Sequence, residues 1–169
     1  MTDESLLIPA GAGSATKGFA GLKHKVRSAQ LDGAVAILEG TIEPGQFIPP
    51  HTHTREDEVS CVIRGELTFR VGDEILKAPA GSYVIKPRGI VHSFWNATDV
   101  PAVAIEVHSP GAFEEYYDAF GELPDGPERM QASMALQRKF GLSMDFELAA
   151  KIARENGLRA PFPPGGEAP

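Results

Sequence analysis

The sequence is poor in cysteine and has no long apolar run, and each absence narrows what the chain does. Cys61 is the single cysteine among 169 residues, so an internal disulfide is excluded, which fits a reducing compartment. No apolar run approaches the roughly 18 residues that a membrane-spanning helix needs. The N-terminus also lacks a basic segment followed by an apolar one. We therefore expect a cytoplasmic protein that makes no contact with a membrane.

An excess of positive charge is missing as well. The chain carries 16 Lys and Arg against 23 Asp and Glu, which gives a formal net charge of -7. Nucleic acids and anionic lipids repel such a surface, so we expect neither as a partner. The length and the hydrophobic share of 42% suit one soluble domain with its own core.

Short apolar runs, cut by glycine, proline and aspartate, fill the chain from about residue 26 to residue 109. Runs of this length at nearly regular spacing predict an all-β sandwich or barrel. Gly72-Asp73 is a hairpin turn signal between two of them. The runs are Ala34–Ile42, Glu58–Ile63, Glu66–Val71, Tyr83–Lys86, Val91–Asn96 and Val103–His108.

After Pro110-Gly111 the apolar spacing becomes helical. Helices are predicted over Glu128–Phe140 and Phe146–Asn156, the second with Asp145 as its cap and Gly157 as its stop. An aromatic stripe precedes them and consists of Phe113, Tyr116, Tyr117 and Phe120. We predict a flexible N-terminal arm over 1–20, a β-barrel over 21–110, a helical extension over 111–158 that packs on the barrel or on a partner, and a disordered tail over 159–169.

Three histidines and one glutamate suggest a metal site. In an extended segment, residues two apart face the same side with Cα atoms about 6.5–7 Å apart, so His51 and His53 can converge on one ion. Glu58 opens the next strand and can add a carboxylate oxygen. His92 lies on a later strand and joins the site only if the sheet curls into a barrel. Each residue alone is weak evidence, since a His-x-His pair is more often ordinary polarity than a ligand pair.

The spacing around these residues is far more specific. Ten positions recur without a gap in the order that defines the two motifs of the cupin superfamily: Gly45, His51, His53, Glu58 and Gly65, then Gly81, Pro87, Gly89, His92 and Asn96. The chain therefore resembles cupins, and it is most similar in texture to small bacterial single-domain cupins of the quercetin dioxygenase-like kind. The resemblance implies a double-stranded β-helix, or jelly-roll barrel, with a short C-terminal helical extension.

The resemblance also implies one divalent ion per chain on His51, His53, Glu58 and His92. Iron, manganese, nickel, copper, cobalt and zinc all tolerate this donor set. We expect a metal-dependent dioxygenase acting on a small phenolic or enol-type substrate, with Glu58 as the catalytic base. The alternatives are a non-oxidative cupin, such as an isomerase, cyclase or lyase, and a small-molecule binding module without turnover.

Alternation along the strands adds expectations about neighbouring positions. Ser60 shares the face of Glu58, and Phe94 shares the face of His92, so both are predicted to line the pocket. Glu106 and His108 share one face of the last strand, and we favour the surface for them over the cavity. His24 is expected to be structural or exposed. A homodimer is expected, because an open barrel leaves strand edges to cover and the aromatic stripe is unusually apolar for an exposed helix.

Overall fold

The computed structural model describes residues 6–158. The tail predicted over 159–169 and the first five residues of the predicted arm lie outside this range. The strands and helices are β1 (Ser14–Ala15), β2 (Leu22–Val26), η1 (Ser28–Leu31), β3 (Ala36–Ile42), β4 (Phe47–His53), β5 (Asp57–Arg64), β6 (Glu66–Val71), β7 (Glu74–Pro79), β8 (Tyr83–Lys86), β9 (His92–Trp95), β10 (Ala102–Ser109), η2 (Gly111–Phe113), α1 (Glu114–Gly121), α2 (Arg129–Phe140), β11 (Leu142–Met144) and α3 (Phe146–Asn156).

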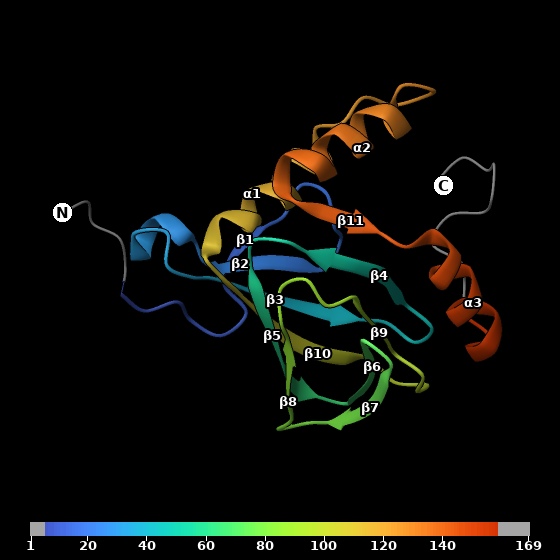
Figure 1. Ribbon diagram of the computed structural model, residues 1–169. Helices are drawn as coiled ribbons and strands as arrows, with labels where there is room; N and C mark the ends of the chain where they lie inside the picture. The colour runs from blue at the N-terminus through green and yellow to red at the C-terminus, as the bar shows by residue number, and fades with distance from the viewer. Residues whose placement is uncertain (1–5, 159–169) are drawn as a thin grey trace.

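Two antiparallel sheets form the body of the protein (Figure 1). The six-stranded sheet has the order β1-β2-β3-β10-β5-β8, and the five-stranded sheet has the order β11-β4-β9-β6-β7. Strands that are neighbours in sequence often lie in different sheets, so β4 and β5 face each other across the interior. The all-β architecture that the sequence predicts is confirmed.

The turns around the motif glycines hold the strands in this register. Gly65 joins β5 to β6 with a φ of +76°, and a Cβ at this position would lie 3.0 Å from Ala102. A side chain would therefore be strained twice, by the backbone angle and by the contact. Asn96 ends the second motif, and its buried amide donates to the carbonyls of Ile42 and Val100. The motif positions thus close the barrel as well as carrying the histidines.

An apolar core fills one end of the space between the sheets. It consists of Ile42, Val62, Leu67, Phe69, Ala78, Val84, Phe94, Ala102 and Ala104. These residues come from alternate positions of strands in both sheets, as the period of two requires. The other end of the interior is polar and holds the histidines and glutamates described below.

The C-terminal extension packs on the chain itself. Phe113 and Tyr116 are buried with Phe140 and Leu142, and Tyr117 and Phe120 pack against this cluster. The helix predicted over Glu128–Phe140 is confirmed with its start one residue later. The helix Phe146–Asn156 is confirmed, with the Asp145 carboxylate accepting from the Leu148 N–H and with Gly157 at its end. The aromatic stripe therefore has its partner within the described chain.

Strand β11 is a feature that the sequence analysis missed. It pairs antiparallel with β4, and Leu142 and Met144 lie opposite His53 and His51. The extension thereby covers an edge that the sheet would otherwise expose at the histidine-bearing strand. Three residues are too few for an alternation pattern to reveal such a strand. Within residues 6–158, no helix is long and apolar enough to cross a membrane.

Candidate metal centre

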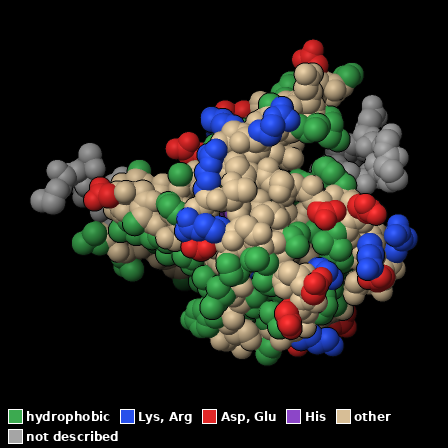
Figure 2. All heavy atoms as spheres, in the orientation of Figure 1, with side chains coloured by type: hydrophobic (Ala, Val, Ile, Leu, Met, Phe, Trp, Pro, Cys, Tyr) green, Lys and Arg blue, Asp and Glu red, His purple; other side chains and the backbone are tan. Residues whose placement is uncertain are grey.

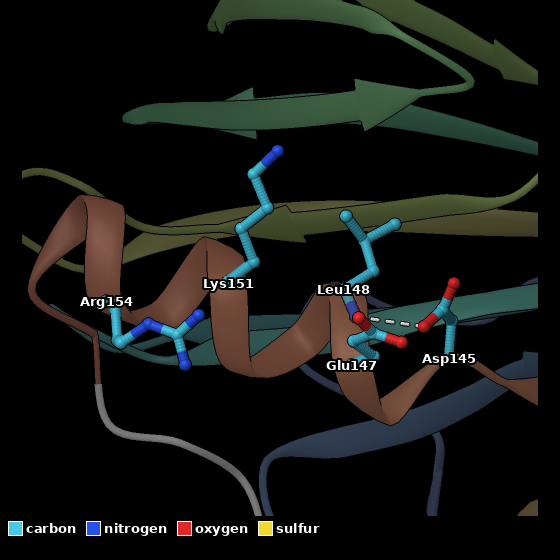
Figure 3. A pocket seen from close by; sticks show the side chains of 5 residues that line it. All are labelled: Asp145, Glu147, Leu148, Lys151 and Arg154. Carbon is cyan, nitrogen blue, oxygen red and sulfur yellow. Dashed lines mark hydrogen bonds between the residues drawn. The ribbon is translucent and has the colours of Figure 1, made fainter.

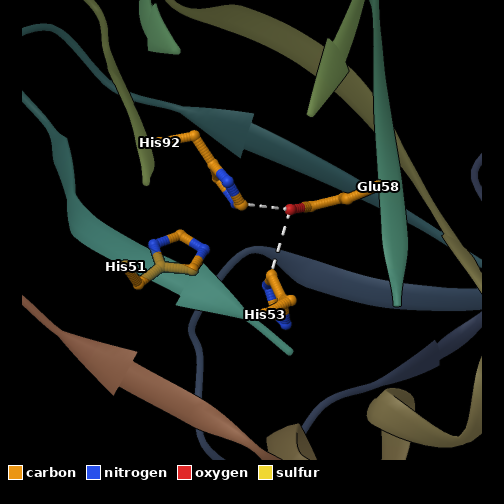
Figure 4. Close-up of side chains that lie close together, drawn as sticks. All are labelled: His51, His53, Glu58 and His92. Carbon is orange, nitrogen blue, oxygen red and sulfur yellow. Dashed lines mark hydrogen bonds and ion pairs between the residues drawn. The ribbon is translucent and has the colours of Figure 1, made fainter. Parts of the chain in front are cut away.

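The two sheets bring the four predicted ligands together at the polar end of the interior (Figure 4). His51 and His53 lie on β4 and His92 lies on β9, opposite His51 in the register. Glu58 reaches toward them from β5 in the other sheet. One ligand atom from each residue lies within 4.8 Å of the other three. His92 joins the group because the sheet does curl, as the sequence analysis required.

The distances suit ligands that share one ion. Glu58 Oε2 lies 2.9 Å from His92 Nε2 and 3.5 Å from His53 Nε2. Two donors at right angles on an ion with bonds of about 2.1 Å lie roughly 3 Å apart. Three imidazole nitrogens and one carboxylate oxygen are a donor set that divalent transition ions accept. The cluster therefore fits a metal site.

Backbone carbonyls orient two of the three imidazoles. His51 Nδ1 lies 2.7 Å from the carbonyl oxygen of Pro49, and His92 Nδ1 lies 3.0 Å from that of Ile90. A carbonyl only accepts, so the proton on Nδ1 can be donated to it, and Nε2 of each ring is then the atom that would face an ion at the centre of the cluster. Burial and the neighbouring imidazoles hold the pKa of His51 well below its usual range, and burial lowers that of His92. Both shifts favour the neutral ring, which is the form that ligates a metal ion.

Glu56 is a residue of this site that the sequence analysis missed. Its side chain is buried, and its Oε2 lies 3.6 Å from Nδ1 of His53. Neither of these two buried atoms has a hydrogen-bond partner among the described residues. A small rotation would let His53 donate to Glu56 and complete the orientation of the third imidazole. The sequence signal was a glutamate three residues after the ligand His53.

Removing this carboxylate should weaken metal binding. We expect Glu56→Ala to lower the affinity for the ion about 10- to 100-fold, the usual cost of losing a group that orients a ligating histidine. Titration of the metal-free protein with Zn(II) against a competing chelator measures the change. Glu43→Ala, in an exposed turn, is the matched control. Equal affinities for Glu56→Ala and the control would remove Glu56 from the site.

Lys86 is the second residue that the sequence analysis missed. It is fully buried on β8 opposite Glu58, and its Nζ lies 2.9 Å from Glu58 Oε1 and 2.7 Å from Glu106 Oε2. Burial alone would raise the pKa of Glu58, but the charge of Lys86 and the nearby histidines hold it well below its usual range. Burial raises the pKa of Glu106 to about 7 against the opposing pull of Lys86. The signal was available, because Val84 faces inward and Lys86 is two residues further along the strand.

The expectation that Glu106 and His108 face the surface is wrong. Glu106 is 7% exposed and His108 is 0% exposed. Glu106 accepts from Ser60 Oγ at 2.7 Å, and His108 Nε2 lies 3.1 Å from the Tyr117 hydroxyl and 3.8 Å from Glu58 Oε1. Alternation along the strand put both residues on one face but did not show which face is the inner one. The polar interior supplies the partners that let both residues be buried.

The other residues singled out in the sequence occupy different places. Ser60 and Phe94 are both buried, Ser60 against Glu106 and Phe94 with its ring centre 5.3 Å from that of Phe69. Their role in lining a substrate pocket stays a prediction. His24 is buried outside the cluster, with its ring nitrogens 3.4 Å from the carboxylates of Glu114 and Asp118. It is structural, and it ties β2 to α1.

A surface pocket with other lining residues lies along α3 (Figure 3). Its lining is Asp145, Glu147, Leu148, Lys151 and Arg154. All but Leu148 are exposed, and the Asp145 carboxylate already caps the helix. Charges of both signs in contact with water do not converge on one ligand chemistry, so the metal cluster is the better candidate for function.

Comparison with known proteins agrees with the fold and the cluster. Residues 38–108, which run from β3 to β10, match the Cupin domain family. The structure of an uncharacterized protein with a double-stranded β-helix domain from Klebsiella pneumoniae superimposes with a TM-score of 0.51 at 22% identity, over 64% of this chain and 92% of that one. The fold is the cupin double-stranded β-helix with a short C-terminal helical part, and these matches support the cupin superfamily.

The curated relatives come from more than one functional class. The chain is 30% identical over 118 residues to Germin-like protein 3-1 of Oryza sativa, which covers 61% of this chain and 52% of that protein. It is 33% identical over 85 residues to H2HPP isomerase of Bacillus subtilis, which covers 50% of this chain and 36% of that protein. The chain thus spans about half or less of the relatives that it matches.

Proposed function

We propose that this protein is a metal-dependent cupin enzyme, with a dioxygenase-type oxidoreductase acting on a small phenolic or enol-type substrate as the leading form. The observation that carries the proposal is the convergence of three imidazoles and Glu58 on one point inside the barrel. When bound, a divalent ion would act there as a Lewis acid and a template for a substrate oxygen and O₂. Iron, manganese, nickel, copper, cobalt and zinc remain the candidate ions.

The residues of the chain would hold and orient the reactants. His51, His53 and His92 present lone pairs from one sheet, and Glu58 presents one carboxylate oxygen from the other. Glu58 is also the proposed base for a substrate hydroxyl. The charge of Lys86 lowers the basicity of this carboxylate, which favours its role as a ligand and makes its role as a base the weaker part of the proposal.

Oxygen uptake tests the proposal. The metal-free protein is loaded with one defined ion at a time and offered a panel of phenolic and enol substrates in an oxygen electrode. We expect substrate-dependent uptake with at least one redox-active ion. Turnover without oxygen would replace the dioxygenase by a non-oxidative enzyme. Thermal stabilisation by a panel compound without turnover would indicate a binding module.

An isomerase is the second candidate. The similarity to H2HPP isomerase favours it, because that match lies at 33% identity. The same centre would polarise a substrate carbonyl, and a proton would be moved without any change of oxidation state. Zinc-loaded protein should then be as active as iron-loaded protein, and anaerobic incubation with enol or keto acids, followed by ultraviolet spectroscopy, distinguishes this function from the first.

We further propose that the protein is a cytoplasmic homodimer that binds a small molecule and no nucleic acid. The aromatic stripe is satisfied within the chain, so the dimer must use other apolar surface. Tyr83 and Ile85 on the edge strand β8 are 72% and 68% exposed, and Ile63 on β5 is 44% exposed. Hydrophobic side chains gather over this part of the molecule in Figure 2. Apolar residues on an edge strand favour association with a second copy.

Ile85→Lys should convert the dimer to a monomer. The interface would then bury one lysine from each copy, and the two positive charges would repel each other. Light scattering at micromolar concentration should give twice the chain mass for the parent protein and the chain mass for the variant. Ile75→Lys, on the opposite edge strand β7, is the control, since Ile75 is 54% exposed. A parent protein that is already monomeric would contradict the dimer.

A further inference from the structure

The inner face of the six-stranded sheet carries a polar ladder that the cupin motifs do not include. Lys86 on β8, Ser60 on β5 and Glu106 on β10 lie beside Glu58, and all of them are buried. Ser60 and Lys86 both donate to Glu106 Oε2 at 2.7 Å. Glu106 thereby balances the lysine charge and fixes the position of Nζ. Glu106 holds Lys86 beside Glu58 Oε1.

The two carboxylate oxygens of Glu58 have different partners, because Lys86 Nζ contacts only one of them. Oε1 lies 2.9 Å from Lys86 Nζ, and Oε2 lies 2.9 Å from His92 Nε2. Oε2 therefore faces the candidate ligands His92 and His53, whereas Oε1 faces Lys86 and lies 3.8 Å from Nε2 of His108. A carboxylate without such a donor can bind an ion through both oxygens, whereas a short charge-assisted hydrogen bond to one oxygen opposes this. The rings of Phe94 and Phe69, with centres 5.3 Å and 5.9 Å from Nζ, leave the ammonium group little freedom to leave.

Stability alone does not explain this lysine. Taking an ammonium group and two carboxylates out of water is costly, and well-packed apolar residues of the same volume often serve a fold at least as well. The ladder is in direct contact with the candidate ligand Glu58, through Lys86, and is not at a distant point of the core. The desolvation cost of these buried charges is better explained by the effect of the ladder on Glu58.

We infer that Lys86, held by Glu106 and Ser60, is a positioning residue that restricts Glu58 to a single-oxygen ligand and so keeps a coordination position open for substrate. This inference rests on the proposed metal centre. The free coordination position on the ion would then depend on the polar ladder as well as on the four motif ligands. Removal of the Lys86 ammonium group should let the second Glu58 oxygen bind the ion and close that position.

The test uses Co(II), whose visible spectrum reports its coordination number. The metal-free parent protein, Lys86→Met and the control Lys77→Met, on the exposed face of β7, are each loaded with cobalt and their d–d bands compared at equal metal content. We expect the parent and the control to share one spectrum. Lys86→Met should show weaker, shifted bands and a loss of the spectral change that azide produces in the parent, because the open position is filled.

The outcomes separate the inference from the proposed function. A parent protein that binds no cobalt would remove the metal centre and the inference with it. A parent that binds cobalt, with an identical spectrum and azide response in Lys86→Met, would overturn the inference and leave the centre standing. Lys86→Met leaves Glu106 without its cation, so Lys86→Met/Glu106→Gln is the second variant, in which no uncompensated carboxylate remains at that position. Failure of both variants to fold would make Lys86 a structural residue and would also overturn the inference.

Discussion

Replacement of His51 and His92 together by alanine should abolish stoichiometric metal binding. These two rings face each other across β4 and β9, with centres 4.4 Å apart, and each Nε2 is aimed at the centre by a carbonyl on Nδ1. Without them only His53 and Glu58 remain, and two donors from opposite sheets do not hold a divalent ion against water. Elemental analysis after gel filtration should fall from one ion per chain to background.

His24→Gln is the control for this experiment. It also removes an imidazole, but one that lies between Glu114 and Asp118 outside the cluster. Its metal content should equal that of the parent. Retention of a full equivalent of metal by the double alanine variant would show that the ion binds elsewhere, and the central proposal would then be wrong.

The barrel and the meeting of the four candidate ligands were predicted through the ten motif positions that the chain shares with cupins, and part of what those positions do is local. The His51-x-His53 spacing follows from the period of a strand, and the glycine and proline positions set the turns that bring His92 back. The C-terminal helices were also predicted from local signals, since caps and periodicity mark their ends. The helices and the His51-x-His53 pair do not depend on which strands become neighbours, whereas the approach of His92 and Glu58 to that pair does.

The polar ladder could not be predicted in the same way. Whether a charged residue such as Glu106 is buried depends on what lies opposite it, and the pairing of β10 with β5 and of β5 with β8 joins residues far apart in the chain. Alternation with Val84 places Lys86 on the inner face of the sheet, but it does not show that the lysine is buried, because a lysine at the end of a strand usually reaches solvent. The strand β11 was hidden because three residues carry no pattern. In each case the sequence did not reveal which strand or side chain would lie opposite in the folded protein.

The roles of Glu58 as ligand and base can be separated by a pair of variants. Glu58→Gln has one oxygen, and both Lys86 and the ion require it. Lys86 donates only, so it should retain the amide oxygen and turn the amide NH₂ toward the imidazoles, where it cannot ligate. We therefore expect the single variant to lose metal affinity as well as activity. Its lost activity alone would say nothing about the base.

Glu58→Gln/Lys86→Met removes this competition. With the ammonium group gone, the amide oxygen is free to face the ion, and metal affinity should recover toward that of the parent. If Glu58 is the base, turnover should stay about 100- to 10,000-fold below that of the parent protein at equal metal content, since an amide cannot accept the substrate proton. Chelator competition measures the first quantity, and the initial rate on the best substrate found in the panel measures the second. Equal rates for the double variant and the parent protein would leave Glu58 as a ligand only, and the chemistry would then need no carboxylate base.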